Sequence, residues 1–211
     1  MAITIDGSSG IASVDGSAGS PSVRGTDANS GILYTADAIK FSTGGTQRAV
    51  IDNNGLSSAG HIVQYVTAIS LGMSSTTSST TSEITSDLRV TMTPISASNK
   101  LIITANLVLH SSSDVITVRM YRQDTGGSLQ MVNEPSGFAS GTWNHGNANA
   151  YANSDPIIQT TVQVIETAGN TTERFYSPYY AIGSGTATNN SYNAGSSYKS
   201  TSTMTVMEVA A

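Results

Sequence analysis

The chain has 211 residues, a length that accommodates one ordinary domain with an appended segment. Only 11% of its residues are charged and 38% are hydrophobic, a balance that allows a buried core and argues against a disordered polyelectrolyte. The net charge of −5, without a cluster of Lys and Arg, excludes nucleic acid as an expected partner, and the lack of cysteine excludes disulfides, thiolate catalysis and cysteine-based zinc sites.

The order of residues also argues against membrane targeting. No stretch approaches the roughly 20 consecutive apolar residues that span a bilayer. The first ten residues, Met1–Gly10, lack the basic-then-apolar order of a signal peptide. We therefore expect no signal peptide and no membrane partner.

Residues 1–60 are predicted to form very short β-strands. Their apolar residues, many of them β-branched, occur in brief runs separated by Gly-rich and Asn-rich turns. Residues 52–55, Asp-Asn-Asn-Gly, indicate a turn, and Ser57–Gly60 indicates a short linker. The predicted strands are Ile3–Ile5, Ile11–Val14, Gly31–Tyr34, Ala38–Ser42 and Arg48–Asp52.

This N-terminal segment has few large apolar side chains for its length. Ordering each residue costs roughly 1–2 kcal/mol of backbone entropy, so a thin core does not stabilise residues 1–60 by itself. We expect neighbouring copies of the chain or another protein to complete the segment, which would then serve for attachment. The candidate attachment residues are Ile3, Ile5, Ile11, Ile32, Tyr34 and Phe41.

From residue 61 onward the predicted strands lengthen, and their number and spacing predict an all-β domain over residues 61–211, a β-sandwich or jelly roll. Arg174–Ile182 is predicted as an aromatic strand pair or a bend, and Met204, Val206 and Glu208 are expected to share one strand face. The other predicted strands are Ile62–Leu71, Leu88–Thr93, Lys100–Leu109, Val115–Arg122, Leu129–Val132, Ile157–Glu166 and Thr203–Val209.

Two predicted loops carry aromatic side chains. Residues 133–155 have little strand character, and loops of this length are usually functional or mobile. Their side chains are candidates for a surface that stacks on sugars or anchors a protein, and the alternative is local packing that holds the loops down. The candidate recognition residues are Trp143, His145 and Tyr151 in the first loop and Tyr192 and Tyr198 in a second loop at 183–200.

Residues typical of reaction chemistry do not form a recognisable pattern. The serines lack a Gly-x-Ser-x-Gly elbow in a strand-to-helix context. The loop acids Asp124, Glu134 and Asp155 are the candidates for a glycosidase acid pair, and we interpret them as solvated carboxylates. The histidines show no metal-ligand spacing: His61, His110 and His145. We therefore expect no catalytic residue, metal or cofactor.

Two parts of the chain resemble tail-fibre and virion-appendage proteins of bacteriophages, especially of cyanophages and marine phages. Gly31–Gly55 is similar to a unit found in fibre shafts just before their terminal domains. Val90–Ile103, Asp155 with Pro156, and Ser202–Val209 are similar to a fibre C-terminal domain. The resemblance implies a trimeric β-rich module on a virion surface, and it supplies no catalytic residue.

The resemblance leaves three functional hypotheses. In the first, residues 1–60 attach a trimeric decoration or cement protein, or a short head fibre, to the capsid. In the second, the chain is the receptor-binding tip of a tail fibre, and its loops contact host surface glycans. The third is a polysaccharide depolymerase. Because a compact domain follows Gly31–Gly55 directly instead of an extended shaft, the sequence favours the first hypothesis.

Overall fold

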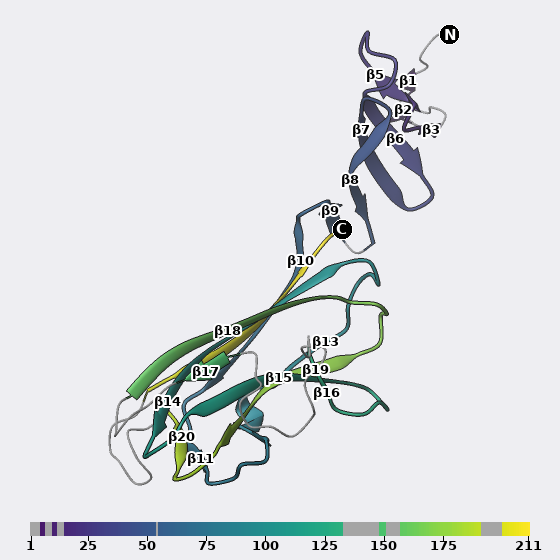
Figure 1. Cartoon of the computed structure of the whole chain (residues 1–211). Coiled ribbons are helices and arrows are strands. Elements are labelled where there is room, and N and C mark those ends of the chain that lie inside the picture. The colour runs from purple at the N-terminus through teal and green to yellow at the C-terminus, as the bar shows by residue number, and fades with distance from the viewer. Residues whose placement is uncertain are drawn as a thin grey trace, which may run out of the picture. The chain divides into compact units, whose positions relative to one another are not determined.

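The structure is a computed structural model, and it is nearly all-β (Figure 1). The chain divides into two compact units, which we call the N-terminal unit (residues 1–63 with 210–211) and the C-terminal unit (64–209). The residues that the structure describes are 5–6, 10–11, 15–53, 55–132, 148–150, 157–190 and 200–211.

The N-terminal unit is built on a five-stranded antiparallel meander in the order β5-β6-β7-β8-β9. Gly44 and Gly45, at the β7–β8 turn, both have positive φ (59° and 75°), which is the backbone that a two-residue hairpin turn of type I′ requires. Two short hairpins, β1–β2 and β3–β4, precede the meander. The strands are β1 (Ile5–Asp6), β2 (Gly10–Ile11), β3 (Gly16–Ser17), β4 (Ser20–Pro21), β5 (Val23–Arg24), β6 (Gly31–Thr35), β7 (Ala38–Thr43), β8 (Thr46–Asp52) and β9 (Gly55–Ser58).

The three longer strands predicted in this unit are confirmed as β6, β7 and β8, whereas the predicted linker Ser57–Gly60 is wrong in its first half. Ser57 and Ser58 belong to β9, where they pair with Val50 and Ala49. The small polar residues of this stretch suggested a linker. They nevertheless form a strand, because pairing with β8 outweighs their low strand propensity. Gly60, two residues after the end of β9, has a positive φ of 78°.

The C-terminal unit consists of two antiparallel sheets and one short 3-10 helix, η1 (Ser86–Leu88), in the part that the structure describes. β10 begins in the N-terminal unit and continues into this one. The strands are β10 (Ile62–Ser70), β11 (Ser74–Thr76), β12 (Ser82–Glu83), β13 (Val90–Met92), β14 (Lys100–Ser111), β15 (Ile116–Asp124), β16 (Gln130–Met131), β17 (Ala148–Ala150), β18 (Ile157–Thr167), β19 (Arg174–Ile182), β20 (Ala187–Asn189) and β21 (Ser202–Val209).

The strand order of these sheets is that of a jelly roll. A jelly roll has eight strands, numbered here from 1 to 8 in chain order. Strand 1 consists of β10 and β11, strand 2 of β12 and β13, strand 5 of β16 and β17, and strand 8 of β20 and β21. Strands 3, 4, 6 and 7 are β14, β15, β18 and β19. One sheet then has the order 1-8-3-6 and the other 2-7-4-5, so successive segments of chain interlock as two Greek keys. The predicted jelly roll is confirmed.

The core lies between the two sheets and draws on both of them. Leu101, Ile103 and Leu107 alternate along β14 and are fully or almost fully buried, and β15 contributes Ile116 and Val118 in the same way. Each such side chain stabilises the fold by about 1.5–3 kcal/mol through its burial. The described residues of the N-terminal unit form no comparable apolar cluster.

Two predictions for this unit have different outcomes. Met204, Val206 and Glu208 share the inward face of β21, as predicted. The strand predicted over Leu88–Thr93 is shorter, because Thr85 caps η1 by accepting a hydrogen bond from the Asp87 amide at 3.2 Å. Leu88 is still buried in the core, but from a helical turn.

Candidate assembly surface

One face of the N-terminal meander consists almost entirely of apolar side chains. Directly paired residues share a face of a sheet, and so do residues two apart along a strand. The registers therefore place two rows on one face: Val23, Ile32, Phe41, Ala49 and Ser58 in the first row, and Tyr34, Ile39, Ile51 and Leu56 in the second. We call these nine residues the apolar face.

The apolar face is exposed in the single chain. Its six largest exposed side chains keep between 37% (Phe41) and 50% (Leu56) of their surface accessible. Isolated apolar residues are normal on protein surfaces, but a continuous apolar sheet face marks a site of interaction. None of these nine residues carries a charge, but charged residues at the border of the face include Asp37, beside Tyr34 and Ile39, and Arg48, which donates to the Thr43 hydroxyl at 3.0 Å. A partner that covers the nine residues therefore gains apolar burial with few ions to desolvate.

The opposite face of the same meander differs in composition and in coverage. It carries Lys40, Asp52 and Ser57 beside Leu33, whose side chain is only 5% exposed. The β3–β4 hairpin lies against β6, where the Tyr34 amide donates to the Asp15 carbonyl at 2.9 Å. Within the described part of this unit, Leu33 is the one large aliphatic side chain that is buried.

The predicted attachment residues fall into two groups. Ile32, Tyr34 and Phe41 lie together on the apolar face. The backbones of Ile5 and Ile11 pair in the β1–β2 hairpin, while their side chains and the whole of Ile3 lie outside the described residues.

Sequence reasoning missed four large members of the apolar face: Val23, Ile39, Ile51 and Leu56. The available signal was alternation, because Ile39 and Phe41 are two residues apart on one predicted strand and Ala49 and Ile51 are two apart on the next. Alternation within each strand fixes which residues share a face. It does not show which faces of separate strands coincide, since that depends on the register.

The predicted recognition residues cannot be assembled into a site. All five lie outside the described residues: Trp143, His145, Tyr151, Tyr192 and Tyr198. Of the other histidines, His61 is exposed, and His110 is buried with its Nδ1 atom 3.3 Å from the Thr188 hydroxyl. In the described ranges, no three His, Asp or Glu side chains converge to hold a metal ion, and no helix there has the length and apolar character needed to cross a membrane.

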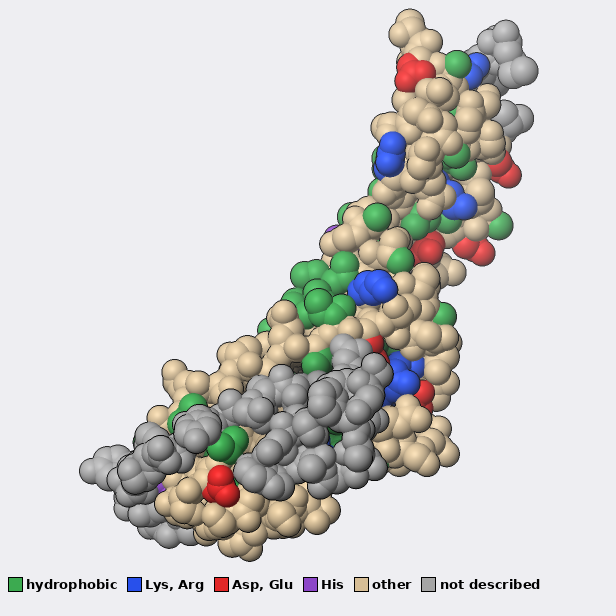
Figure 2. Space-filling view, viewed as in Figure 1, with side chains coloured by type: hydrophobic (Ala, Val, Ile, Leu, Met, Phe, Trp, Pro, Cys, Tyr) green, Lys and Arg blue, Asp and Glu red, His purple; other side chains and the backbone are tan. Residues whose placement is uncertain are grey.

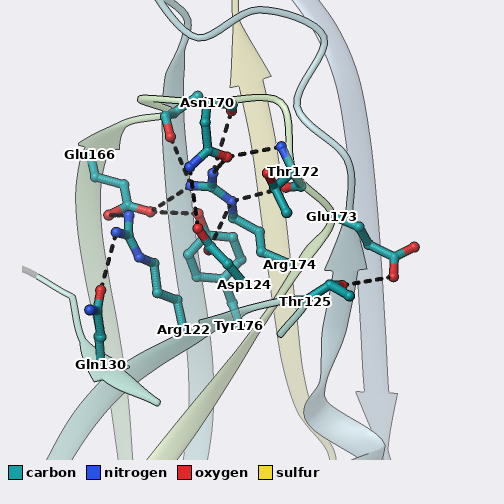
Figure 3. A network of polar contacts seen from close by, with 11 residues as sticks. Arg122, Asp124, Thr125, Gln130, Glu166, Asn170, Thr172, Glu173, Arg174 and Tyr176 are labelled. Carbon is teal, nitrogen blue, oxygen red and sulfur yellow. Dashed lines mark hydrogen bonds and ion pairs between the residues drawn. The ribbon is translucent and has the colours of Figure 1, made fainter. Parts of the chain in front are cut away.

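A polar cluster at one end of the sandwich includes Asp124 (Figure 3). The prediction that Asp124 is a solvated loop acid is wrong, because it is the last residue of β15 and lies beside a buried arginine. Arg174 is fully buried and lies 3.3 Å from Asp124 and 3.8 Å from Glu166. It also donates to the Ala168 carbonyl at 2.9 Å. Asp124 thus forms an ion pair with a buried cation, and we interpret this pair as part of the fold and not as part of a catalytic site.

The remaining contacts of the cluster connect the two sheets. Glu166, on β18, accepts from Arg122 on β15 at 2.7 Å and from the hydroxyl of Tyr176 on β19 at 2.5 Å. Burial raises the pKa of Tyr176 above its ordinary value of 10.0, and the neighbouring Glu166 carboxylate adds to the effect. The tyrosine is therefore a neutral donor, and the cluster joins the sheets through charge-assisted hydrogen bonds.

No protein-family model and no curated protein sequence matches the chain. Among solved structures, the chain is similar to the VP2 protein of infectious bursal disease virus in a subviral particle (12% identity, TM-score 0.38, 82% of this chain and 47% of that one). It is also similar to a mutant VP2 of that virus in derived particles (11%, 0.39, 90% and 50%) and to the Gt strain (10%, 0.40, 94% and 56%).

The chain thus spans about half the length of these viral proteins. With TM-scores below 0.5, the likeness is distant and carries no argument about function.

Proposed function

We propose that the chain is a non-enzymatic structural protein of a virion surface that assembles as a homotrimer through the apolar face. The C-terminal unit is then the displayed part. The specific role that we favour is a capsid decoration or cement protein, or a short head fibre, held to the particle by the N-terminal segment.

The apolar face is the observation that carries this proposal. Six large apolar side chains on one sheet face are at least one-third exposed in the single chain, while the described part of the same unit buries one large aliphatic side chain. Such a unit gains its stability from association, as obligate oligomers do, because their interfaces resemble a hydrophobic core in composition. The number of three copies rests on the resemblance of Gly31–Gly55 to fibre-shaft units.

The fold and the surface are compatible with a structural role. Jelly rolls occur in viral capsid and lectin domains, although a fold alone does not determine function. On the face in view, charged side chains are sparse and scattered over a largely neutral surface (Figure 2). A neutral surface of Ser, Thr, Asn and Gly offers hydrogen bonds to neighbouring proteins with little electrostatic repulsion.

The virion role is tested by locating the protein on a particle that carries it, by cryo-electron microscopy with an antibody label. The proposal predicts many copies distributed over the head, each contacting capsid subunits through its N-terminal unit. A few copies at the tip of the tail would favour the alternative, a receptor-binding fibre that recognises host glycans. Absence of the protein from purified particles would overturn both.

The third hypothesis, a polysaccharide depolymerase, has a separate test. Asp124, the last residue of β15, is paired with the buried Arg174, and Glu134 and Asp155 lie outside the described residues. We expect no release of reducing sugar when the purified protein is incubated with host polysaccharide. Release that is lost on substitution of one of these acids would contradict the non-enzymatic role.

A further inference from the structure

Apolar side chains gather on the outer face of one sheet of the jelly roll, where β14 and β21 pair. Side chains of both strands alternate between the buried core and this outer face. On the outer face, Ile102 is paired directly with Met207, and the next pair is Lys100 with Val209. Three apolar side chains of two strands therefore lie together at this end of the sheet.

β10, the other neighbour of β21, adds an aromatic side chain to this group. The Thr67 hydroxyl lies 3.4 Å from the Thr205 hydroxyl, so these two residues face each other across the two strands. Because β10 and β21 run antiparallel, Tyr65, two residues before Thr67, lies beside Met207, two residues after Thr205. Hydrophobic side chains form one group where Figure 1 labels β10 (Figure 2). We call this set the outer patch: Tyr65, Ile102, Met207 and Val209.

The outer patch has the composition of an interface anchor. Tyr65 is 60% exposed, which makes it the most exposed aromatic side chain in the described ranges, and its three neighbours are half-buried. Tyrosine is enriched among the residues that contribute most to protein interfaces, and it is most effective on an apolar surround that excludes water. Lys100 borders the patch, where its ammonium group donates to the Thr167 hydroxyl at 2.6 Å.

The course of the chain determines which partner meets the outer patch at high concentration. The chain passes from the N-terminal unit to the C-terminal unit after Val63 and returns to it at Ala210. Tyr65 and Val209 are therefore within two residues of the N-terminal unit at the two crossings, and two residues extend over at most about 7 Å. When N-terminal units assemble, the outer patches of the copies are tethered beside one another, and short tethers give effective concentrations of about millimolar.

We propose that the outer patch is a second contact between copies of the chain, in which Tyr65 of each copy packs on the outer patch of the neighbouring copy. The contact holds the jelly rolls together at the end where the chain enters and leaves them. This inference rests on the proposed function, because assembly of the N-terminal units supplies the tether. A capsid protein would have to cover the same patch without that tether.

The chain contains no cysteine, so a single introduced cysteine reports where copies approach each other. In the full chain, Tyr65→Cys treated with a short bis-maleimide should yield covalent dimers. Losing the ring weakens the contact, but the N-terminal units keep the copies assembled and the cysteines close. Ile39→Glu combined with Tyr65→Cys should abolish the cross-link, because it removes the tether.

Gln159→Cys is the matched control on the same outer face. Gln159 is exposed and is paired with Val108, which is six residues, or about 20 Å, along β14 from Ile102. We expect no cross-link from it. Equal cross-linking of Gln159→Cys and Tyr65→Cys would overturn the proposal. Cross-linking of Tyr65→Cys that persists with Ile39→Glu would overturn the dependence on the tether.

A charge at Tyr65 tests the same contact without a covalent bond. Tyr65→Glu should raise the concentration at which the assembly dissociates by about tenfold or more, because the carboxylate would be desolvated in the contact. Gln159→Glu adds the same charge away from the patch and should leave that concentration unchanged.

The two levels of the account fail separately. A parent chain that assembles, while Tyr65→Cys does not cross-link and Tyr65→Glu dissociates at the parent's concentration, would overturn this inference and leave the proposed function standing. A parent chain that stays a single copy at every concentration would overturn both.

Discussion

At the scale of single residues, the polar side chains that alternate with the core are mostly engaged in contacts within the fold. Glu83 shows how. Arg89 donates to both of its carboxylate oxygens at 2.6 Å, Ser177 donates at 2.7 Å, and the Arg89 guanidinium lies 4.8 Å from the centre of the Phe175 ring. Arg89 and Ser177, which bind Glu83, lie 6 and 94 positions away from it along the chain. Sequence patterns could not identify such pairs, because the register of several strands determines them.

The contacts of Glu83 predict how stability depends on pH. Burial opposes ionisation, but the hydrogen bonds from Arg89 and Ser177 outweigh it and hold the pKa of Glu83 below its ordinary value of 4.5. A lowered folded-state pKa stabilises the protein above pH 4.5, and the stabilisation is lost as pH falls through the folded-state pKa. Because Arg89 is 44% exposed, we expect a contribution of about 1 kcal/mol or less at neutral pH.

Urea unfolding of the parent chain and of Glu83→Gln, measured from pH 6 down to pH 3, checks this dependence. The free energy of unfolding should fall less steeply on the acid side in Glu83→Gln than in the parent. Arg89→Gln should flatten the same part of the curve, and combining the two substitutions should add little. Identical acid-side slopes in the parent chain and Glu83→Gln would contradict the assignment.

At the scale of strands and sheets, hydrophobic alternation predicted the long elements well. In β15, Ile116, Val118 and Met120 face the core as their spacing indicated. The same alternation continues to Arg122 and Asp124, which are therefore carried to the inner side at the end of the strand. The short strands were harder to predict. β3, β4 and β20 have only two or three residues each, and pairing rather than propensity defines them.

The buried cluster around Arg174 predicts a strong effect on the stability of the sandwich. Arg174→Met should lower the free energy of unfolding by about 3–5 kcal/mol, because it leaves Asp124 and Glu166 without their buried cation. The control Lys100→Met removes an exposed lysine bound to Thr167, and we expect a change within about 0.5 kcal/mol. Chemical denaturation measures both. A loss for Arg174→Met as small as that of the control would show that the cluster does not hold the sheets together.

At the scale of the whole molecule, the two units differ in where their described apolar side chains lie. The C-terminal unit has a continuous core between its sheets. The N-terminal unit exposes its largest apolar side chains on one face. The sequence predicted the jelly roll and the thin N-terminal core from composition and alternation. It did not predict that residues of all five strands from β5 to β9 would form one apolar face, because this depends on how the strands are paired in register.

The apolar face also predicts which substitutions separate the copies. Ile39 lies on the central strand of the meander and is 40% exposed in the single chain, so a glutamate there is solvated in the monomer but desolvated in the assembly. Ile39→Glu should therefore dissociate the assembly. Ser57→Glu adds the same charge to the opposite face and is the matched control, which should leave the assembly intact.

The most direct test of the account is the molar mass of the full chain, measured by light scattering over a dilution series. The account predicts that the smallest assembly on dilution has three times the 21.8 kDa mass of one chain, that Ile39→Glu has the mass of one chain, and that Ser57→Glu behaves like the parent. A folded parent chain with the mass of a single copy at every concentration would contradict it.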